Sequence, residues 1–257
     1  MKNEVITVQS VDRALIILEI LQGEPDGLGV TELSTELKVS KSTAHRLLMS
    51  LLKKGFVQQD PENQKYRLGL KLIEFGQTVS NNIDIRKVAS SHLRRLAEKT
   101  GETAHLVIQE RSEIVYIDKI ESSATIRMFS NIGKRAPMHC TGVGKAILAF
   151  LPQQEILDIV EDKGLEKFTH KTIINIETLL LHLEEIRNNG YSIDDEEHEL
   201  GIKCAAAPIF NSKGEVVAGI SVAGPIMRVT EDKLSAMAME VLQTSQEISK
   251  LLGGKVS

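Results

Sequence analysis

Residues 39–55 read VSKSTAHRLLMSLLKKG, and this stretch predicts a short amphipathic helix. One side of its helical wheel is apolar and consists of Ala44, Leu47, Leu48 and Leu51. The opposite side consists of Ser42, Arg46, Met49 and Lys53. Ser40 is placed to cap the start of the helix, and Gly55 is placed to end it. We expect the helix to pack one side on a core and to present the other side to a partner.

Positive charge is concentrated around this helix. No acidic residue occurs from position 38 to position 59, whereas the basic residues there are Lys38, Lys41, Arg46, Lys53 and Lys54. The segment from Lys38 to Lys71 contains eight Lys or Arg residues and two acidic residues, in a chain whose net charge is −4. A basic patch on an acidic protein favours a single surface that contacts nucleic acid. For the helix alone, a solvated charged face is the alternative interpretation.

The segments on both sides of the helix indicate a winged helix-turn-helix. Upstream, TELSTEL at 31–37 predicts a helix capped by Thr31, and residues 38–40 have the length of the turn in a helix-turn-helix. Downstream, residues 56–59 and 64–68 predict two strands joined by a turn that carries Asp and Pro at its first two positions.

Two more helices complete the N-terminal part. Residues 10–22, opened by Ser10 as a cap, predict the first helix of a DNA-binding domain that spans residues 1–68. Residues 69–83 predict a linker helix, on which Leu72, Phe75 and Val79 extend an apolar face that begins at Leu68. Because a DNA reader with one short helix generally acts in pairs, we expect this face to help form a homodimer or homotetramer.

From residue 102 onward, strands alternate with helices. The predicted strands are 103–109, 113–120, 125–130, 191–197, 202–210 and 215–222. The predicted helices are 85–100, 141–150, 176–189 and 230–252. Residues 84–257 are therefore expected to form a separate α/β sensing domain, which makes the whole chain α+β.

Composition sets further limits. At 257 residues and 42% hydrophobic content, two domains are expected. The first ten residues lack the pattern of a signal peptide, and no apolar run approaches the roughly 20 residues that a membrane span needs. A cytoplasmic protein without a membrane partner is expected. Cys140 and Cys204 are too few for a disulfide framework and are expected to be reduced.

The string TGVGK at 141–145 favours an anion. Thr141 would cap a helix whose first turn exposes main-chain N–H groups, and these groups together with the helix dipole suit a carboxylate. The string is not a nucleotide-binding P-loop, because the first glycine is missing and Lys145 is followed by Ala146. No cofactor is expected.

For DNA, the predicted roles follow from side-chain chemistry. Ser42, Thr43 and Arg46 should reach base edges, and Arg46 can contact guanine through two hydrogen bonds. The predicted phosphate contacts are Lys41, Lys53, Lys65 and Arg67. His45, at the edge of the exposed face, could contact either a base edge or a phosphate.

Four segments resemble the IclR family of bacterial transcriptional regulators. They are SVDRALIILEIL at 10–21, KVSKSTAHRLLMSLLKKGFV at 38–57, HCTGVGKAILA at 139–149 and DDEEHELGIKCAAAPIFNSKGEVVAGISVAGP at 194–225. Residues 65–76, 113–122 and 126–137 are further similar to a subfamily of repressors that respond to the sugar acid 2-keto-3-deoxygluconate. The resemblance implies a GAF-like C-terminal domain that binds a small, usually anionic metabolite, and dimers or tetramers on palindromic operators.

The resemblance also implies which residues bind the effector. Carried onto this chain, they are Gly142, Val143, Asp194, Ile202, Cys204 and Ser221. Asp194 would accept a hydrogen bond from an effector hydroxyl, and Ser221 would donate one. Position 223 is Ala where relatives often have Ser, so one polar contact would be missing.

Two alternatives concern the C-terminal domain. His139, Cys140, His198 and Cys204 are residue types that bind zinc, although no pair has the usual spacing. Cys204 and His198 could also be the nucleophile and base of a small hydrolase. Neither alternative explains the winged helix, so we expect a regulator that is not an enzyme and has neither catalytic nor metal-binding residues.

Overall fold

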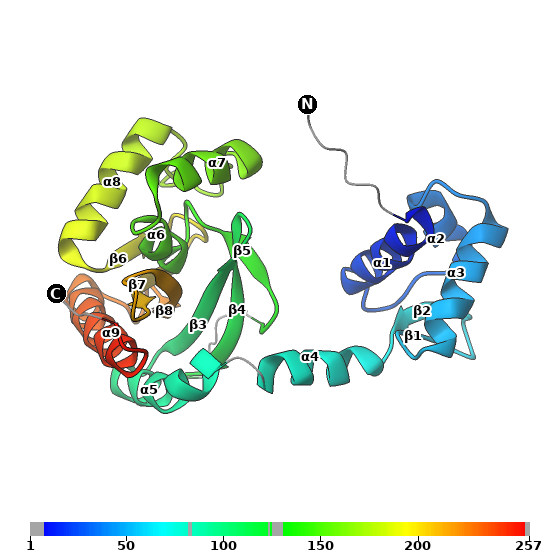
Figure 1. Cartoon of the computed structure of the whole chain (residues 1–257), viewed down its shortest axis with the longest axis horizontal. Coiled ribbons are helices and arrows are strands. Elements are labelled where there is room, and N and C mark those ends of the chain that lie inside the picture. Colours follow the sequence, from blue (N-terminus) through cyan, green and yellow to red (C-terminus); the bar gives the residue numbers. More distant parts are fainter. Residues whose placement is uncertain (1–7, 82–83, 123, 125–130, 255–257) are drawn as a thin grey trace. The chain divides into compact units, whose positions relative to one another are not determined.

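The computed structural model describes residues 8–81, 84–122, 124 and 131–254. The chain divides into two compact units, residues 1–82 and residues 83–257 (Figure 1). Each unit has its own hydrophobic core. The strand predicted at 125–130 lies outside the described residues.

The N-terminal unit is a winged helix-turn-helix, as the sequence predicts. Its elements are the helices α1 (Gln9–Gln22), α2 (Val30–Glu36) and α3 (Lys41–Lys53), the antiparallel strands β1 (Val57–Gln59) and β2 (Tyr66–Leu68), and the helix α4 (Lys71–Asn81). Ala44 and Leu48 of α3 are fully buried, and Leu48 packs in one cluster with Ile17 of α1 and Leu33 of α2. Burial of one side of α3 leaves its other side at the surface.

The ends of α3 are those that the sequence predicts. The Ser40 side chain accepts a hydrogen bond of 3.2 Å from the Thr43 main-chain N–H. Gly55 has φ +77°, a left-handed conformation that glycine adopts without the penalty of a Cβ atom. The turn between α2 and α3 contains Lys38, also at positive φ.

Two predicted caps are wrong. Thr31 lies inside α2, which starts at Val30 after Gly29, and the Gly29 N–H donates to the Glu32 carboxylate at 2.6 Å. Ser10 lies inside α1, which starts one residue earlier with Val8 as its N-cap and no capping side chain. Both residues therefore have helical backbones, whereas a capping residue needs an extended one.

The predicted apolar face of the linker helix also differs. Leu68 belongs to β2 and packs in the core of the N-terminal unit, and Leu72 is half-buried. Phe75 is exposed as predicted, and the other exposed apolar side chains here are Leu70 and Ile73. Phe75 packs on Phe56, with ring centroids 5.3 Å apart. The Val79 side chain lies outside what the structure describes.

The C-terminal unit is built on one antiparallel sheet of six strands in the order β5-β4-β3-β8-β7-β6. The strands are β3 (Thr103–Glu110), β4 (Glu113–Ile120), β5 (Arg135–Pro137), β6 (Ser192–Asp195), β7 (Ile202–Phe210) and β8 (Val216–Pro225). The helices are α5 (Asp84–Thr100), α6 (Gly142–Leu148), α7 (Gln153–Lys163), α8 (Ile176–Asn189) and α9 (Glu231–Leu251). β5 and α7 are not among the elements that the sequence pattern predicts.

Helices cover both faces of this sheet. α5 and α9 lie on one face, and α6, α7 and α8 lie on the other (Figure 1). Neighbouring strand residues supply different cores, since Leu106 packs with α5 and α9 while Val107 packs with α6. In β7, Ala205 faces the first core and Cys204 the second. The unit therefore has three layers, which confirms the predicted α+β fold.

Leu48→Ala tests the core of the winged helix. Because Leu48 is fully buried, its truncation should destabilise the N-terminal unit by about 2–5 kcal/mol. Met49→Ala, on the exposed side of α3, should change stability by less than about 0.5 kcal/mol. Urea-dependent hydrogen exchange of peptides from residues 9–68 in the full chain measures this unit separately. Equal effects of the two substitutions would contradict the burial of Leu48.

Candidate DNA-binding face and ligand cavity

The exposed side of α3 carries the residues predicted to contact DNA. Lys41, Ser42, His45, Arg46 and Lys53 are exposed, and Thr43 is half-buried. The Ser42 and Thr43 hydroxyls lie 3.0 and 2.9 Å from the Ser40 hydroxyl. Within the described parts of the chain, Lys41, Arg46 and Lys53 form no ion pair. Unpaired cations on one exposed helix face are suited to phosphates and base edges.

In the wing, the two residues predicted to contact phosphates differ in whether they have an acidic partner. Lys65 is half-buried and forms no ion pair with any described residue. Arg67 is paired with Asp60 at 3.1 Å. Hydrogen bonds from the main-chain N–H groups of Glu62 and Asn63 lower the pKa of Asp60. The Arg67 charge is therefore partly compensated inside the protein, which weakens its case as a phosphate contact.

A small, partly open cavity lies beside α6 in the C-terminal unit. Its volume is about 40 Å³, and its lining residues are His105, Tyr116, Thr141, Gly142, Val143, Asp194, His198, Glu199, Ile202, Cys204, Ser221 and Ala223. All six predicted effector residues are among them. Segments that are far apart in the sequence thus meet at one site.

Strand register brings the polar residues of the cavity together. Asp194 of β6 pairs with Cys204 of β7, which pairs with Ala223 of β8. In the neighbouring row, Ser221 pairs with His105 of β3. Residues that pair across strands project to the same face of a sheet. Two adjacent rows of side chains therefore form one wall of the cavity.

The start of α6 forms the opposite wall because glycine lets it approach the sheet. A Cβ atom on Gly142 would lie 3.0 Å from the Cys204 Sγ, and one on Gly144 would lie 2.5 Å from the Met138 carbonyl oxygen. Thr141 caps the helix, since its hydroxyl oxygen accepts from the Gly144 N–H at 3.2 Å. The N–H groups of Gly142 and Val143 have no acceptor among the described residues.

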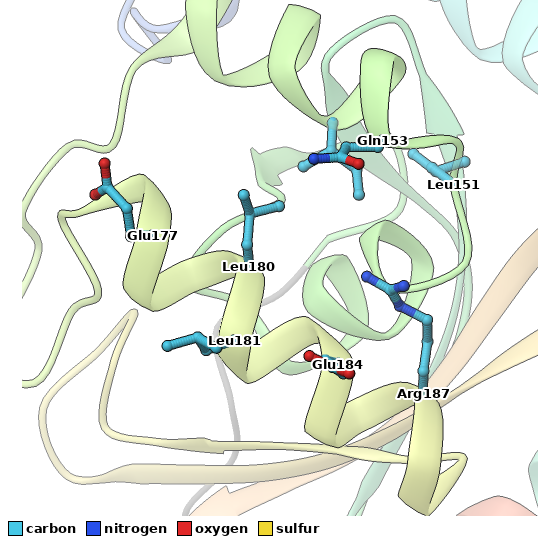
Figure 2. Close-up of a pocket in the computed structure, with 8 residues that line it drawn as sticks. Leu151, Gln153, Glu177, Leu180, Leu181, Glu184 and Arg187 are labelled. Atoms are coloured by element: carbon cyan, nitrogen blue, oxygen red, sulfur yellow. The ribbon is translucent and has the colours of Figure 1, made fainter.

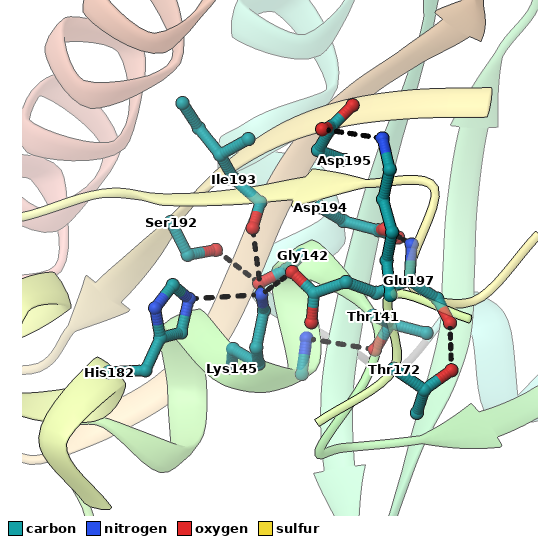
Figure 3. A network of polar contacts seen from close by, with 12 residues as sticks. Thr141, Gly142, Lys145, Thr172, His182, Ser192, Ile193, Asp194, Asp195 and Glu197 are labelled. Carbon is teal, nitrogen blue, oxygen red and sulfur yellow. Dashed lines mark hydrogen bonds and ion pairs between the residues drawn. The ribbon is translucent and has the colours of Figure 1, made fainter. Parts of the chain in front are cut away.

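Lys145 points away from the cavity mouth into the protein, where it is fully buried. Its ammonium group donates to the Ile193 carbonyl oxygen at 2.8 Å and pairs with the Glu197 carboxylate (Figure 3). The His182 Nε2 lies 3.1 Å from the same nitrogen. The sequence analysis did not identify this network, because GVGK alone does not show where the lysine side chain lies.

Asp194 is the most perturbed acid of the cavity. It is buried, and its Oδ1 accepts a hydrogen bond of 2.7 Å from the Glu197 main-chain N–H. Burial raises the pKa of Asp194 to about 7, although the Lys145 charge and the Glu197 hydrogen bond act in the opposite direction. Near neutral pH this carboxyl group is therefore present both as an acid and as a carboxylate, so it can donate or accept a hydrogen bond.

Three other titratable side chains of the cavity, those of His105, Tyr116 and Cys204, stay uncharged at neutral pH. Burial, with the nearby Lys119 charge, lowers the pKa of His105 to about 3. Burial also raises the pKa values of Tyr116 and Cys204 well above their usual range. The imidazole of His105 and the ring of Tyr116 pack edge to face, 5.2 Å apart. Apart from the acidic residues, the cavity wall is neutral.

Several cavity residues were not assigned to the effector site from the sequence. These are His105, Tyr116, Thr141, His198 and Glu199. His105 lies two residues after Thr103 on β3, so strand alternation places it on the inner face. That signal shows which face a residue occupies but not which face holds a ligand.

Neither alternative chemistry is supported by the geometry. The described residues contain no group of three or more His, Cys, Asp or Glu side chains arranged for a metal ion. The imidazoles of His139 and His198 both pack against the Phe168 ring. A raised pKa keeps the Cys204 thiol protonated, whereas a nucleophilic cysteine requires the thiolate. The geometry of the described residues therefore favours neither a zinc site nor a cysteine nucleophile.

A larger hollow lies between α7 and α8, and Figure 2 shows its lining. Its volume is about 430 Å³, and it is lined by Leu151, Gln153, Ile156, Glu177, Leu180, Leu181, Glu184 and Arg187. None of these residues was predicted to bind a ligand. The cavity beside α6 is the better candidate for the effector site, because all six residues that the family resemblance implies line it.

A winged helix with an exposed basic helix, followed by an α/β unit with a small cavity, is typical of a ligand-responsive transcriptional regulator. Two family models match: the IclR helix-turn-helix domain at residues 10–61 and the C-terminal domain of bacterial IclR transcriptional regulators at residues 77–250. The chain belongs to the IclR family. Among the described residues, no helix is long and apolar enough to cross a membrane.

Relatives cover almost the whole chain. The transcriptional regulator XynR of Escherichia coli is 39% identical over 96% of this chain and 98% of its own length. The transcriptional regulator KdgR of Escherichia coli is 38% identical over 95% of this chain and 94% of its own length. The crystal structure of the Thermotoga maritima IclR protein superposes with a TM-score of 0.78 at 36% identity, and covers 95% of this chain and 98% of that one.

The pH dependence of stability tests the environment of Asp194. An acid whose pKa is higher in the folded than in the unfolded protein lowers stability as pH rises from the unfolded to the folded pKa. Asp194→Asn should therefore change stability little near pH 4 and raise it by roughly 1–4 kcal/mol at pH 8, at about 1.4 kcal/mol per pKa unit. Urea unfolding of the C-terminal unit in the full chain, measured between pH 4 and 8, gives these values.

The neighbouring residue provides a control of opposite sign. Although burial acts against it, hydrogen bonds from Lys171 and Lys203 lower the pKa of Asp195. Asp195→Asn should therefore reduce stability above pH 4. A stability difference for Asp194→Asn that stays constant from pH 4 to pH 8 would show that Asp194 is not perturbed.

Proposed function

We propose that this regulator is a repressor that binds a palindromic operator as a homodimer or homotetramer and releases it when a small carboxylate metabolite binds beside α6. The exposed basic side of α3 is the observation that carries the DNA-binding part, because its cations have no acidic partners among the described residues. Resemblance to sugar-acid-responsive repressors supports repression. Two-fold symmetric subunits would explain a palindromic operator.

Base reading is assigned to the first two turns of α3. Ser42, Thr43 and Arg46 lie at or near the surface of the helix that follows the turn, which is the position of a recognition helix in the major groove. Lys41 and Lys53 at its two ends and Lys65 in the wing would hold phosphates. His45 remains a candidate for either role.

Arg46→Ala and Lys53→Ala distinguish these roles. Arg46→Ala should weaken binding to the operator by roughly 1–3 kcal/mol and change binding to a scrambled duplex little, because a base contact is lost. Lys53→Ala should weaken binding to both duplexes alike. It should also reduce by about one the slope of the logarithm of the binding constant against the logarithm of the salt concentration. Fluorescence anisotropy at several salt concentrations measures both. Equal losses for Arg46→Ala on the two duplexes would refute its role in base reading.

Exposed apolar side chains support self-association. α4 and the residue before it expose Leu70, Ile73 and Phe75, and α1 exposes Val11 and Leu15. Large apolar side chains gathered on the surface of a small domain usually mark an interaction site. A second copy of the chain is the partner that a palindromic operator requires.

For the effector, the cavity favours a small acid that also carries hydroxyl groups. The free N–H groups of Gly142 and Val143 could bind a carboxylate, while Asp194 and Ser221 could bind hydroxyls. The sugar acid 2-keto-3-deoxygluconate fits this description. The cavity is small and partly open, so the loop after β6, which supplies His198 and Glu199 to its lining, would contact a ligand of this size directly.

Anion binding should be coupled to the charge of Asp194. A carboxylate that enters beside Asp194 is repelled by the ionised form and accepted by the neutral acid. Affinity for the acid should therefore fall as pH rises above about 7, approaching tenfold per pH unit. Asp194→Asn should remove most of this dependence. Calorimetric titration between pH 6 and 8 is the measurement, and a wild-type affinity independent of pH would argue against a carboxylate next to Asp194.

The decisive experiment for the whole proposal combines DNA and effector. Binding of the full chain to DNA from upstream of its own gene is compared with binding to a scrambled duplex at physiological salt, with and without 2-keto-3-deoxygluconate. Selective binding that the acid releases is the expected result. Selective binding that the acid leaves unchanged would reject this effector and keep the regulator, and equal binding to both duplexes would reject the upstream region as operator.

A further inference from the structure

We infer that Lys145 is a positioning residue of the ligand cavity: through Glu197 it holds the Asp194 carboxylate and the loop of residues 196–201 in place at the cavity wall. The inference rests on the proposed effector site and assigns a role to residues that do not line it. Its basis is a continuous chain of contacts from the buried lysine to the cavity.

The first link is the enclosure of the lysine. Lys145 has no exposed surface, and its three ammonium hydrogens match three acceptors, which are the Ile193 carbonyl oxygen, the Glu197 carboxylate and His182 Nε2 (Figure 3). Two of these acceptors belong to β6 and the loop that follows it. The lysine on α6 therefore fixes that loop to the helix that forms the opposite wall of the cavity.

The second link is Glu197 itself. Its main-chain N–H donates to the Asp194 Oδ1 at 2.7 Å, so the position of Glu197 determines how the Asp194 carboxylate is oriented. Its carbonyl oxygen accepts hydrogen bonds from the hydroxyls of Thr172 at 2.6 Å and Thr169 at 3.3 Å. Glu197 is thus held through its side chain, its N–H and its carbonyl group.

The third link is the loop beyond Glu197. The next two residues, His198 and Glu199, line the cavity, and so does Ile202 at the start of β7. A ligand in the cavity therefore contacts this segment directly. The Lys145–Glu197 pair anchors this segment at one end, so it should control how the segment closes on a ligand.

Stability alone does not explain a buried ion pair at this place. Removing two charges from water is costly, and well-packed apolar side chains of similar size often serve a core at least as well. The second oxygen of the Glu197 carboxylate, Oε2, is buried without a hydrogen-bond partner among the described residues, which adds to that cost. A pair that is expensive to keep, next to a ligand cavity, is better explained by positioning.

The main variant of the test removes both charges together, so that no buried charge is left alone. The double variant Lys145→Met/Glu197→Leu replaces the pair by apolar side chains of similar size, and Glu197→Gln keeps an acceptor for Lys145. Glu102→Gln is the matched control, because Glu102 is also buried and paired, with Arg228 at 2.6 Å and Lys233 at 2.7 Å. Glu102 contacts the Gly224 side of β8, whereas the neighbouring Ala223 faces the cavity.

Two readouts on the full chain separate positioning from a general loss of stability. Hydrogen exchange of peptides covering residues 194–201, without ligand, should be roughly tenfold faster in the double variant and unchanged in Glu102→Gln. The concentration of 2-keto-3-deoxygluconate that releases the upstream DNA should rise roughly tenfold in the double variant. DNA affinity without the acid should stay at the wild-type value. In the separate variant Glu197→Gln, both readouts should lie closer to wild type than in the double variant.

The outcomes distinguish this inference from the proposed function. Unchanged exchange at residues 194–201 in the double variant overturns the inference, whether or not the acid is the effector. Faster exchange with an unchanged response to the acid also overturns it, because the loop would then be irrelevant to binding. If the acid does not release DNA from the wild-type protein, the proposed effector is rejected. In that case the comparison of hydrogen exchange between the double variant and Glu102→Gln decides whether Lys145 positions the wall.

Discussion

The register of β6, β7 and β8 is the constraint on which the ligand cavity depends. Asp194, Cys204 and Ala223 are aligned across these three strands, so their side chains share one face of the sheet. A slip of one residue would turn the slipped strand's cavity residues toward α5 and α9 and would place polar groups in an apolar core. The alternation that fills the two cores therefore also fixes which residues face a ligand. α6 completes the site because glycine at 142 lets its first turn lie against Cys204 and Asp194 of the sheet.

The sequence predicts best what depends on local pattern. The periodicity of α3, its cap at Ser40 and the two strands of the wing are encoded within about thirty residues, and all are confirmed. The wrong cap predictions at Ser10 and Thr31 have a local cause too. A hydroxyl side chain near the start of a helix does not determine which residue has the extended backbone of an N-cap. The six effector positions could be named only by resemblance, because spacing in sequence does not give strand register. Lys145 was beyond prediction, since its partner Glu197 is 52 positions away.

The charged side chains of this protein lie in two different kinds of environment. On α3, Arg46 and its basic neighbours lie in water without acidic partners among the described residues, so their fields are available to a polyanion. Around the loop after β6, the half-exposed Asp195 and Glu196 are paired with Lys171, which removes most of their field. The net charge of −4 therefore says little about function. What matters for binding is which charged side chains are left without an internal partner.

The pairing of Lys145 with Glu197 leaves Asp194 as the acid that can change its charge. An acidic run beside an anion site looks contradictory, but three of its four members are compensated: Asp195 and Glu196 by Lys171, and Glu197 by Lys145. Asp194 receives only main-chain hydrogen bonds and a more distant cation, and burial raises its pKa to about 7. A proton can therefore bind there together with an anionic ligand, so the pair enters the cavity with no net charge and avoids the desolvation cost of an isolated carboxylate. The acidic run and the anion site are then compatible, because the same buried lysine fixes the geometry of Asp194 without neutralising it.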